Sequence, residues 1–142
     1  MNTLNPNKYI RKAYIEAIEN QTALKVWHRK IPKTVNPIPT AYILLDSQTK
    51  NETAKAKTDY FEWLCTLDVH IFNVNDKGYS NQAFVDDIEG IVNRIIRVDG
   101  VVIENFVNKN TNILESMELP IETETKSIDR TVIKFEHWLY GR

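Results

Sequence analysis

The chain has 142 residues, a length that favours a single domain with one hydrophobic core. Hydrophobic residues make up 42% and charged residues 26%, with 4 Gly and 5 Pro, which is typical of a globular protein and excludes a disordered or fibrous one. The net charge of −1 argues against strong overall attraction to nucleic acid or to an anionic membrane. The single cysteine, Cys65, excludes a disulfide framework and a cysteine-based zinc site.

The chain contains no apolar run near the roughly 20 residues that span a bilayer, and residues 1–12 lack the apolar stretch of a signal peptide. We therefore expect a soluble, intracellular protein without a membrane partner.

The near-neutral total conceals a charge difference along the chain. Residues 1–57 carry ten basic and four acidic side chains, a net charge of +6, and the remaining residues carry eight and fifteen, a net charge of −7. Two interpretations are open. Either the two parts neutralise each other within one folded subunit, or one surface is basic and another acidic, so that copies stack head to tail.

The first third of the chain predicts one helix and two strands. Apolar side chains recur at spacings of three and four over residues 6–20, which indicates an amphipathic helix. Residues 25–29 are short and β-prone. Residues 31–39 contain three prolines, which lack the backbone donor of a sheet, and therefore form an extended loop or a sheet edge. Residues 41–46 then predict a buried strand.

Residues 47–59 are polar and contain no large apolar side chain, so they predict a long loop. We expect this loop to belong to a single domain that spans residues 1–142. Lys50, Lys55 and Lys57 lie in this loop, together with Glu52. In an assembly around a duplex, these lysines would meet phosphates without reading sequence. A solvated surface loop is the alternative.

The middle of the chain predicts a long strand followed by a helix. Apolar and polar side chains alternate over residues 60–74, and residues 75–78 form a turn. Ser80 is a suitable N-cap for a helix over residues 80–97. One apolar stripe marks the buried face of that helix, and it consists of Phe84, Val85, Ile88, Ile91, Val92, Ile95 and Ile96.

The last third predicts three further strands, over residues 101–106, 115–124 and 131–140, with a loop at residues 108–112. Pro120 suggests a sheet edge. Both faces of the end of the last strand carry apolar side chains, and one of them is a candidate for cover by another subunit. Long strands joined by short turns favour an α+β fold, a mainly antiparallel β-sheet with two α-helices packed on one face.

No motif in the sequence indicates catalysis, a cofactor or a metal. His28, His70 and His137 are far apart and show no spacing of a local ligand motif. Cys65 alternates with apolar residues and is expected to be a small core residue. The chain contains no phosphate-binding loop and no nucleophile-elbow or zinc-protease motif. We therefore expect no enzyme, no cofactor and no catalytic, cofactor-binding or metal site.

Two further groups of residues have structural explanations. Asp86, Asp87 and Glu89 lie early in the second helix, where acidic groups suit the helix dipole and face water. A small ligand-binding or enzymatic α+β domain that uses Asp86, Asp87 or His70 in a cleft remains the alternative. The aromatic side chains that are able to stack on bases are explained by core packing, and they are Tyr42, Tyr60, Trp63 and Trp138.

Several segments in sequence order resemble small phage tail-terminator, or tail-completion, proteins. They are the helix YIRKAYIEAI, the loop IPKTVNPIPTAYILL, a charged polar insertion, the strand YFEWLCTLDVHIF, the helix NQAFVDDIEGIVNRII and the last strand DRTVIKFEHWLY. The family pattern P-x-P-Y-I-x-L is similar to residues 37–45 of this chain. The resemblance spans nearly the whole chain and rests on element order and apolar pattern. Residues 100–125 depart from it, being longer and more acidic.

The resemblance implies an α+β subunit of a ring, usually a hexamer, with a dodecamer as the alternative for a short-tailed phage. Such a ring lies in the virion at the head–tail junction, after assembly in the host cytoplasm. It would end tail assembly, join the tail proteins to the head connector or portal-side proteins, and leave a central channel for non-specific passage of DNA. On this resemblance the loop at residues 47–59, with Lys50, Glu52, Lys55 and Lys57, would reach a neighbouring subunit or the lumen.

Overall fold

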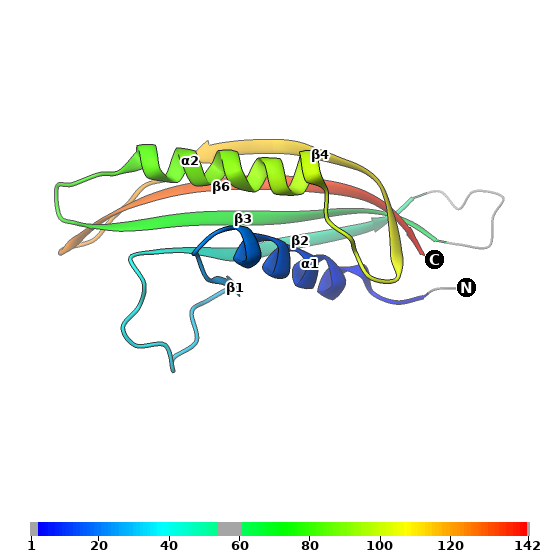
Figure 1. The fold of residues 1–142 in the computed structure, drawn as a ribbon, viewed down its shortest axis with the longest axis horizontal. Coiled ribbons are helices and arrows are strands. Elements are labelled where there is room, and N and C mark those ends of the chain that lie inside the picture. Colours follow the sequence, from blue (N-terminus) through cyan, green and yellow to red (C-terminus); the bar gives the residue numbers. More distant parts are fainter. Residues whose placement is uncertain (1–2, 54–60, 142) are drawn as a thin grey trace.

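A computed structural model describes residues 3–53 and 61–141, which form helices on a twisted sheet (Figure 1). The elements in chain order are α1 (Pro6–Gln21), β1 (Val26–His28), β2 (Ala41–Glu52), β3 (Glu62–Asp76), α2 (Gln82–Asn93), the π-helical segment η1 (Arg94–Asp99), β4 (Phe106–Glu118), β5 (Ile121–Glu122) and β6 (Lys126–Gly141). This architecture confirms the predicted α+β fold.

The sheet has the strand order β1-β2-β3-β6-β4, and β5 pairs with β6 outside this path. The β1 and β2 pair is parallel, and the other pairs are antiparallel. The long strands β3 and β6 form the centre, in register from Glu62 opposite Tyr140 to Asp76 opposite Lys126. The strands β1 and β4 therefore lie at opposite edges of the sheet (Figure 1).

Both helices cover one face of the sheet and share a single core with it (Figure 1). Strand alternation turns Cys65, Leu67, Val69 and Ile71 of β3 toward the helices, and all four are fully buried. The helices supply the other side of this core with Ile10, Tyr14, Ile18, Val85, Ile88, Val92, Ile95 and Ile96. The opposite face of the sheet carries no helix within the described residues, and we call it the open face.

The two predicted helices are confirmed in position, and the predicted cap of the second is wrong. The expected helix at residues 80–97 appears as α2 followed directly by η1. The N-cap of α2 is Asn81, which makes no side-chain capping bond. Ser80 lies outside the helix, and its hydroxyl donates a 2.7 Å hydrogen bond to Asp129 of β6. A long-range partner therefore replaces the local cap that the sequence suggested.

The predicted loop at residues 47–59 is shorter than expected, because residues 47–52 continue β2. Their backbone pairs with β3 from Thr49 opposite Thr66 to Glu52 opposite Trp63, after a register shift that follows Asp46. A polar strand is stable here because the ladder to β3 needs backbone groups only. Residues 54–60 lie outside the described part of the chain.

The bounds of the C-terminal strands also differ from the prediction. Residues 101–105 form a loop, and the expected loop at residues 108–112 lies inside β4. Two irregularities in its pairing with β6, between Asn108 and Asn110 and between Ile113 and Glu115, obscure the alternation of the sequence. Within the described residues, no helix is long and apolar enough to cross a membrane.

Candidate functional site

The predicted loop residues Lys50 and Glu52 are exposed at the end of β2, whereas Lys55 and Lys57 lie outside the described residues. The Nζ atom of Lys50 lies 5.5 Å from the centre of the Trp63 ring on β3, which is a cation–π distance. Lys50 therefore has a partner within its own hairpin.

A polar cluster at this end of the sheet joins three strands and was missed by the sequence analysis. Glu62 forms a 3.1 Å ion pair with Lys109 and accepts 3.3 Å hydrogen bonds from the Trp138 indole and the Thr53 hydroxyl. The hydrogen bond from Lys109 holds the pKa of Glu62 below its usual value. The Lys109 Nζ atom also lies 4.3 Å from the Trp138 ring centre. No local pattern marks this cluster, because its members are distant in sequence.

The three histidines do not converge. His137 is buried on the helix-covered face, where its Nε2 atom hydrogen-bonds the Tyr14 hydroxyl and its Nδ1 atom lies 3.2 Å from the Thr111 hydroxyl oxygen. His28 lies at the edge in β1, and His70 lines the open face. Burial lowers the pKa of His137 to about 4, so this side chain is neutral at pH 7. Among the described residues, no group of three His, Cys, Asp or Glu side chains is placed to hold a metal ion.

A shallow groove on the open face contains His70, but not the carboxylates that the alternative function would combine with it. The groove has a volume of about 180 Å³, and its lining includes Asp68, His70 and Lys134. Burial raises the pKa of Asp68 and lowers that of His70. Asp86 and Asp87 are exposed on α2, which covers the other face. The groove is also smaller than the usual range of ligand pockets, about 300–1,000 Å³.

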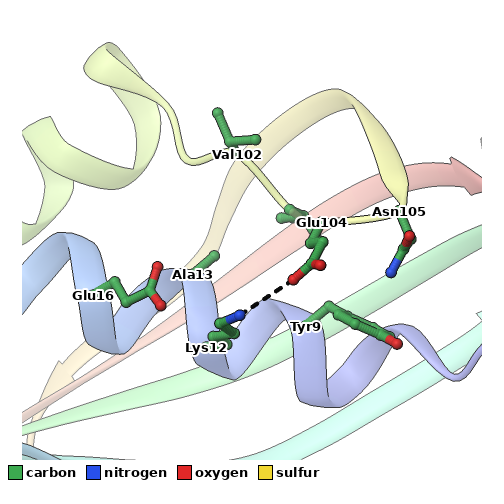
Figure 2. A pocket seen from close by; sticks show the side chains of 8 residues that line it. Tyr9, Lys12, Ala13, Glu16, Val102, Glu104 and Asn105 are labelled. Atoms are coloured by element: carbon green, nitrogen blue, oxygen red, sulfur yellow. Dashed lines mark hydrogen bonds and ion pairs between the residues drawn. The ribbon is translucent and has the colours of Figure 1, made fainter.

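A larger hollow lies between α1 and the loop that precedes β4 (Figure 2). It has a volume of about 540 Å³, and Figure 2 shows Lys12 of α1 reaching toward Glu104 of the loop across it. This ion pair measures 3.2 Å, and both side chains are about 60% exposed. The hydrogen bond to Glu104 raises the pKa of Lys12, which keeps the ammonium charged and unsuited to act as a nucleophile.

Cys65 lies in the core, as the sequence predicted. The side chain is fully buried, and burial raises the pKa of its thiol to about 12. Since the thiolate is the nucleophilic form, burial and the raised pKa make Cys65 a weak nucleophile in this fold.

Aromatic side chains form a row across the open face. Tyr42 stacks on Phe72 at 4.9 Å between ring centres, and Trp27 and His70 continue the row at 6.3 Å and 6.1 Å. The prediction that Tyr42 belongs to the main core is therefore wrong, because its strand turns it away from the helices. Trp138, also expected in the core, is 38% exposed, whereas Trp63 packs against the core as expected. Tyr60 lies outside the described residues.

The start of α2 is fixed to the sheet through one carboxylate. Asp129 of β6 is 7% exposed and accepts hydrogen bonds from the Ser80 hydroxyl, the Asn81 backbone N–H and the Asn75 side-chain amide, at 2.7, 2.7 and 2.8 Å. Burial acts to raise the pKa of Asp129, but the hydrogen bonds to its carboxylate together outweigh burial and lower the pKa. This network positions the helix relative to the strands.

The charge difference along the chain becomes a spatial separation in the fold. Of the six ion pairs between described residues, the contact of Lys12 with Glu104 is the one that joins residues 1–57 to the rest. On the covered face, α1 packs on β1 and β2 at one end of the strand order, and α2 packs on β3 and β6 toward the end formed by β4 (Figure 1). This arrangement favours the interpretation that the subunit has one basic and one acidic surface.

The chain matches no protein-family model and no curated protein sequence. It is similar in structure to a chain of the virion of a native gene transfer agent particle, with a TM-score of 0.76 and 10% sequence identity, over 98% of this chain and 100% of that one. A second solved chain is similar with a TM-score of 0.58 and 14% identity, over 92% of this chain and 94% of that one. At these identities the similarity establishes a shared fold that extends over almost the whole chain.

Proposed function

We propose that this chain is a structural, non-enzymatic virion subunit that forms an oligomeric ring at a phage head–tail junction. The ring ends tail assembly and joins the tail to the head connector, with a central channel for DNA. The observation that carries the proposal is the fold shared, over 98% of this chain, with a chain from a gene transfer agent virion. The resemblance of the sequence to tail-terminator proteins supports the position at the junction.

The proposed partners are further copies of this chain, head connector or portal-side proteins, and tail proteins. A hexamer is the expected ring, and a dodecamer is the alternative. The net charge of −1 suits a channel subunit, because DNA must pass without being held tightly. The place of action is the virion, after assembly in the host cytoplasm.

We further propose that the segment with Lys50, Glu52, Lys55 and Lys57 reaches a neighbouring subunit or the lumen. The exposure of Lys50 and Glu52 at the end of the β2 and β3 hairpin supports this proposal. A Glu52→Cys variant carrying a photoreactive thiol crosslinker tests it. Crosslinked dimers are expected if the segment contacts a neighbour, and crosslinks to added duplex DNA are expected if it lines the lumen. The absence of both products would contradict the proposal.

The ring itself is tested by mass photometry and negative-stain electron microscopy at micromolar concentration. The protein is measured alone and after mixing with a head connector or tail protein of the same phage, because some rings assemble only on a partner. A ring with a central hole is expected in at least one condition. A strict monomer in all conditions would overturn the proposal.

A further inference from the structure

Opposite edges of the sheet expose opposite charges. The basic edge consists of β1 with its flanking residues and the loop that follows, and its charged side chains are Lys25, Arg29, Lys30 and Lys33. The acidic edge consists of α2 with the second half of β4, and its charged side chains are Asp86, Asp87, Glu89, Glu115 and Glu118. The strand order places β1 and β4 at the two ends of the sheet, so these edges face away from each other (Figure 1).

The nine charged side chains at these edges make no ion pairs within the described part of the subunit, although Glu115 lies opposite Lys134 of β6 in the strand pairing. A hydrogen bond from the Ser116 hydroxyl of β4 to Glu89 of α2 joins the two elements of the acidic edge. Strand alternation places Glu118 on the same face as Ser116, whereas Glu115 lines the groove on the open face. Like charges that lie close together repel each other, and each edge therefore gains from a partner of opposite sign.

Both edges also expose apolar side chains that are able to anchor a contact. Ile38, in the loop of the basic edge, is 60% exposed. On and just after β4, Leu114, Met117 and Leu119 are 51%, 40% and 37% exposed. Apolar anchors surrounded by charged groups are the usual composition of a protein–protein interface.

We propose that the basic edge of one subunit docks on the acidic edge of a second copy of the same chain, in a head-to-tail contact that repeats around the assembly. Each subunit carries one basic and one acidic edge, with similar numbers of charged side chains on the two. A second copy of the chain therefore complements both edges, whereas nucleic acid would complement the basic edge alone. A contact between two unlike surfaces generates a ring when its rotation closes. The inference rests on the proposed ring function and specifies which surfaces build the ring.

Two charge-reversal variants test the contact. The first carries Lys25→Glu, Arg29→Glu and Lys30→Glu, which makes both of its edges acidic. The second carries Asp87→Lys, Glu115→Lys and Glu118→Lys, which makes both edges basic. Each variant alone is expected to lose assembly, with the apparent dissociation constant of the subunit contact raised at least about tenfold. Far-UV circular dichroism and thermal unfolding establish that each variant is folded.

Mixing and combining the variants distinguish a specific contact from a general effect of charge. An equimolar mixture is expected to restore assembly, in rings with even numbers of subunits, because acidic and basic variants must alternate. The matched control carries both sets of reversals in one chain, keeps the net charge of the wild-type protein, and is expected to assemble by itself. All samples are compared by mass photometry at low salt, in the condition in which the wild-type protein forms a ring.

The outcomes separate this inference from the proposed function. If the wild-type protein forms a ring and both variants assemble equally well alone, the head-to-tail contact is wrong and the ring function stands. A mixture of folded variants that yields only dimers, or remains monomeric, would also overturn the contact. A wild-type protein that forms no ring in any condition would overturn the ring function and this inference together.

Discussion

Acid is expected to destabilise this protein through His137, which the fold holds neutral. The imidazole is fully buried between α1 and the sheet, with its Nε2 atom hydrogen-bonded to the Tyr14 hydroxyl. Burial lowers the pKa of His137 to about 4 in the folded chain. In the unfolded chain the pKa returns to about 6.5. Between these two values the unfolded chain binds the proton and the folded chain does not, so stability decreases as the pH falls.

The size of the effect follows from the two pKa values of His137. The stability that depends on the neutral imidazole is fully present above a pH of about 7.5, and about 2 kcal/mol of it is lost at a pH of about 5. Below the folded pKa the loss levels off at about 3 kcal/mol. His28 and His70, whose pKa values are also lowered by burial, act in the same direction. The slope that belongs to His137 must therefore be isolated with a variant.

The double variant Tyr14→Phe and His137→Leu removes the titrating group without leaving the tyrosine hydroxyl unpaired. Urea unfolding, followed by tryptophan fluorescence, gives the free energy of unfolding of each protein at pH 7.5 and pH 5. We expect the loss between these pH values to be about 2 kcal/mol smaller in the double variant than in the wild-type protein. The variant His70→Gln, which alters a half-buried histidine on the open face, is the control and is expected to keep most of the slope. Equal losses in wild-type protein and double variant would refute the assignment to His137.

Three further predictions concern the free energy of unfolding measured by urea titration at pH 7. Replacing Asp129 by Asn is expected to cost about 2–3 kcal/mol, because a buried carboxylate that accepts three hydrogen bonds is lost. The control Asp87→Asn, on the exposed face of α2, is expected to change stability by less than about 0.5 kcal/mol. Equal effects of the two substitutions would contradict the anchoring role of Asp129. Phe135→Ala empties a fully buried position in the core and is expected to cost about 3–5 kcal/mol, and a loss below about 1 kcal/mol would mean that the core closes around the site. Lys12→Ala removes an exposed ion pair with Glu104 and is expected to cost less than about 1 kcal/mol. A larger loss would mean that this ion pair stabilises the fold more than an exposed pair usually does.

The sequence predicts well those elements whose periodicity comes from one buried face. In β3, Cys65, Leu67 and Val69 alternate with polar residues, and the helices of the fold cover this face. The apolar stripe of the second predicted helix likewise appears as the buried face of α2 and η1. In both cases the hydrophobic effect acts on side chains close in sequence, so a local pattern is enough.

Prediction fails where an element is held by backbone pairing or by distant polar partners. The second half of β2 and the middle of β4 are polar strands, and their ladders to β3 and β6 use backbone groups that every residue carries. Ser80 has the composition of a helix cap, yet its hydroxyl bonds Asp129, which lies 49 positions away. Glu62 likewise meets Lys109 and Trp138 only after the strands have assembled. Such pairings depend on the register of the sheet, which no single segment encodes.

The proposed head-to-tail contact also explains how a long sheet with two ends avoids uncontrolled pairing. An exposed edge strand is a template for association with any other strand, and charged side chains are one of the means by which proteins limit this. Here two acidic edges repel each other, as do two basic edges, so the pairing that remains is between unlike edges. In the proposed contact, placing Lys25 and Arg29 at one end of the sheet and Glu115 and Glu118 at the other would disfavour symmetric dimers and leave the polarity that a ring requires.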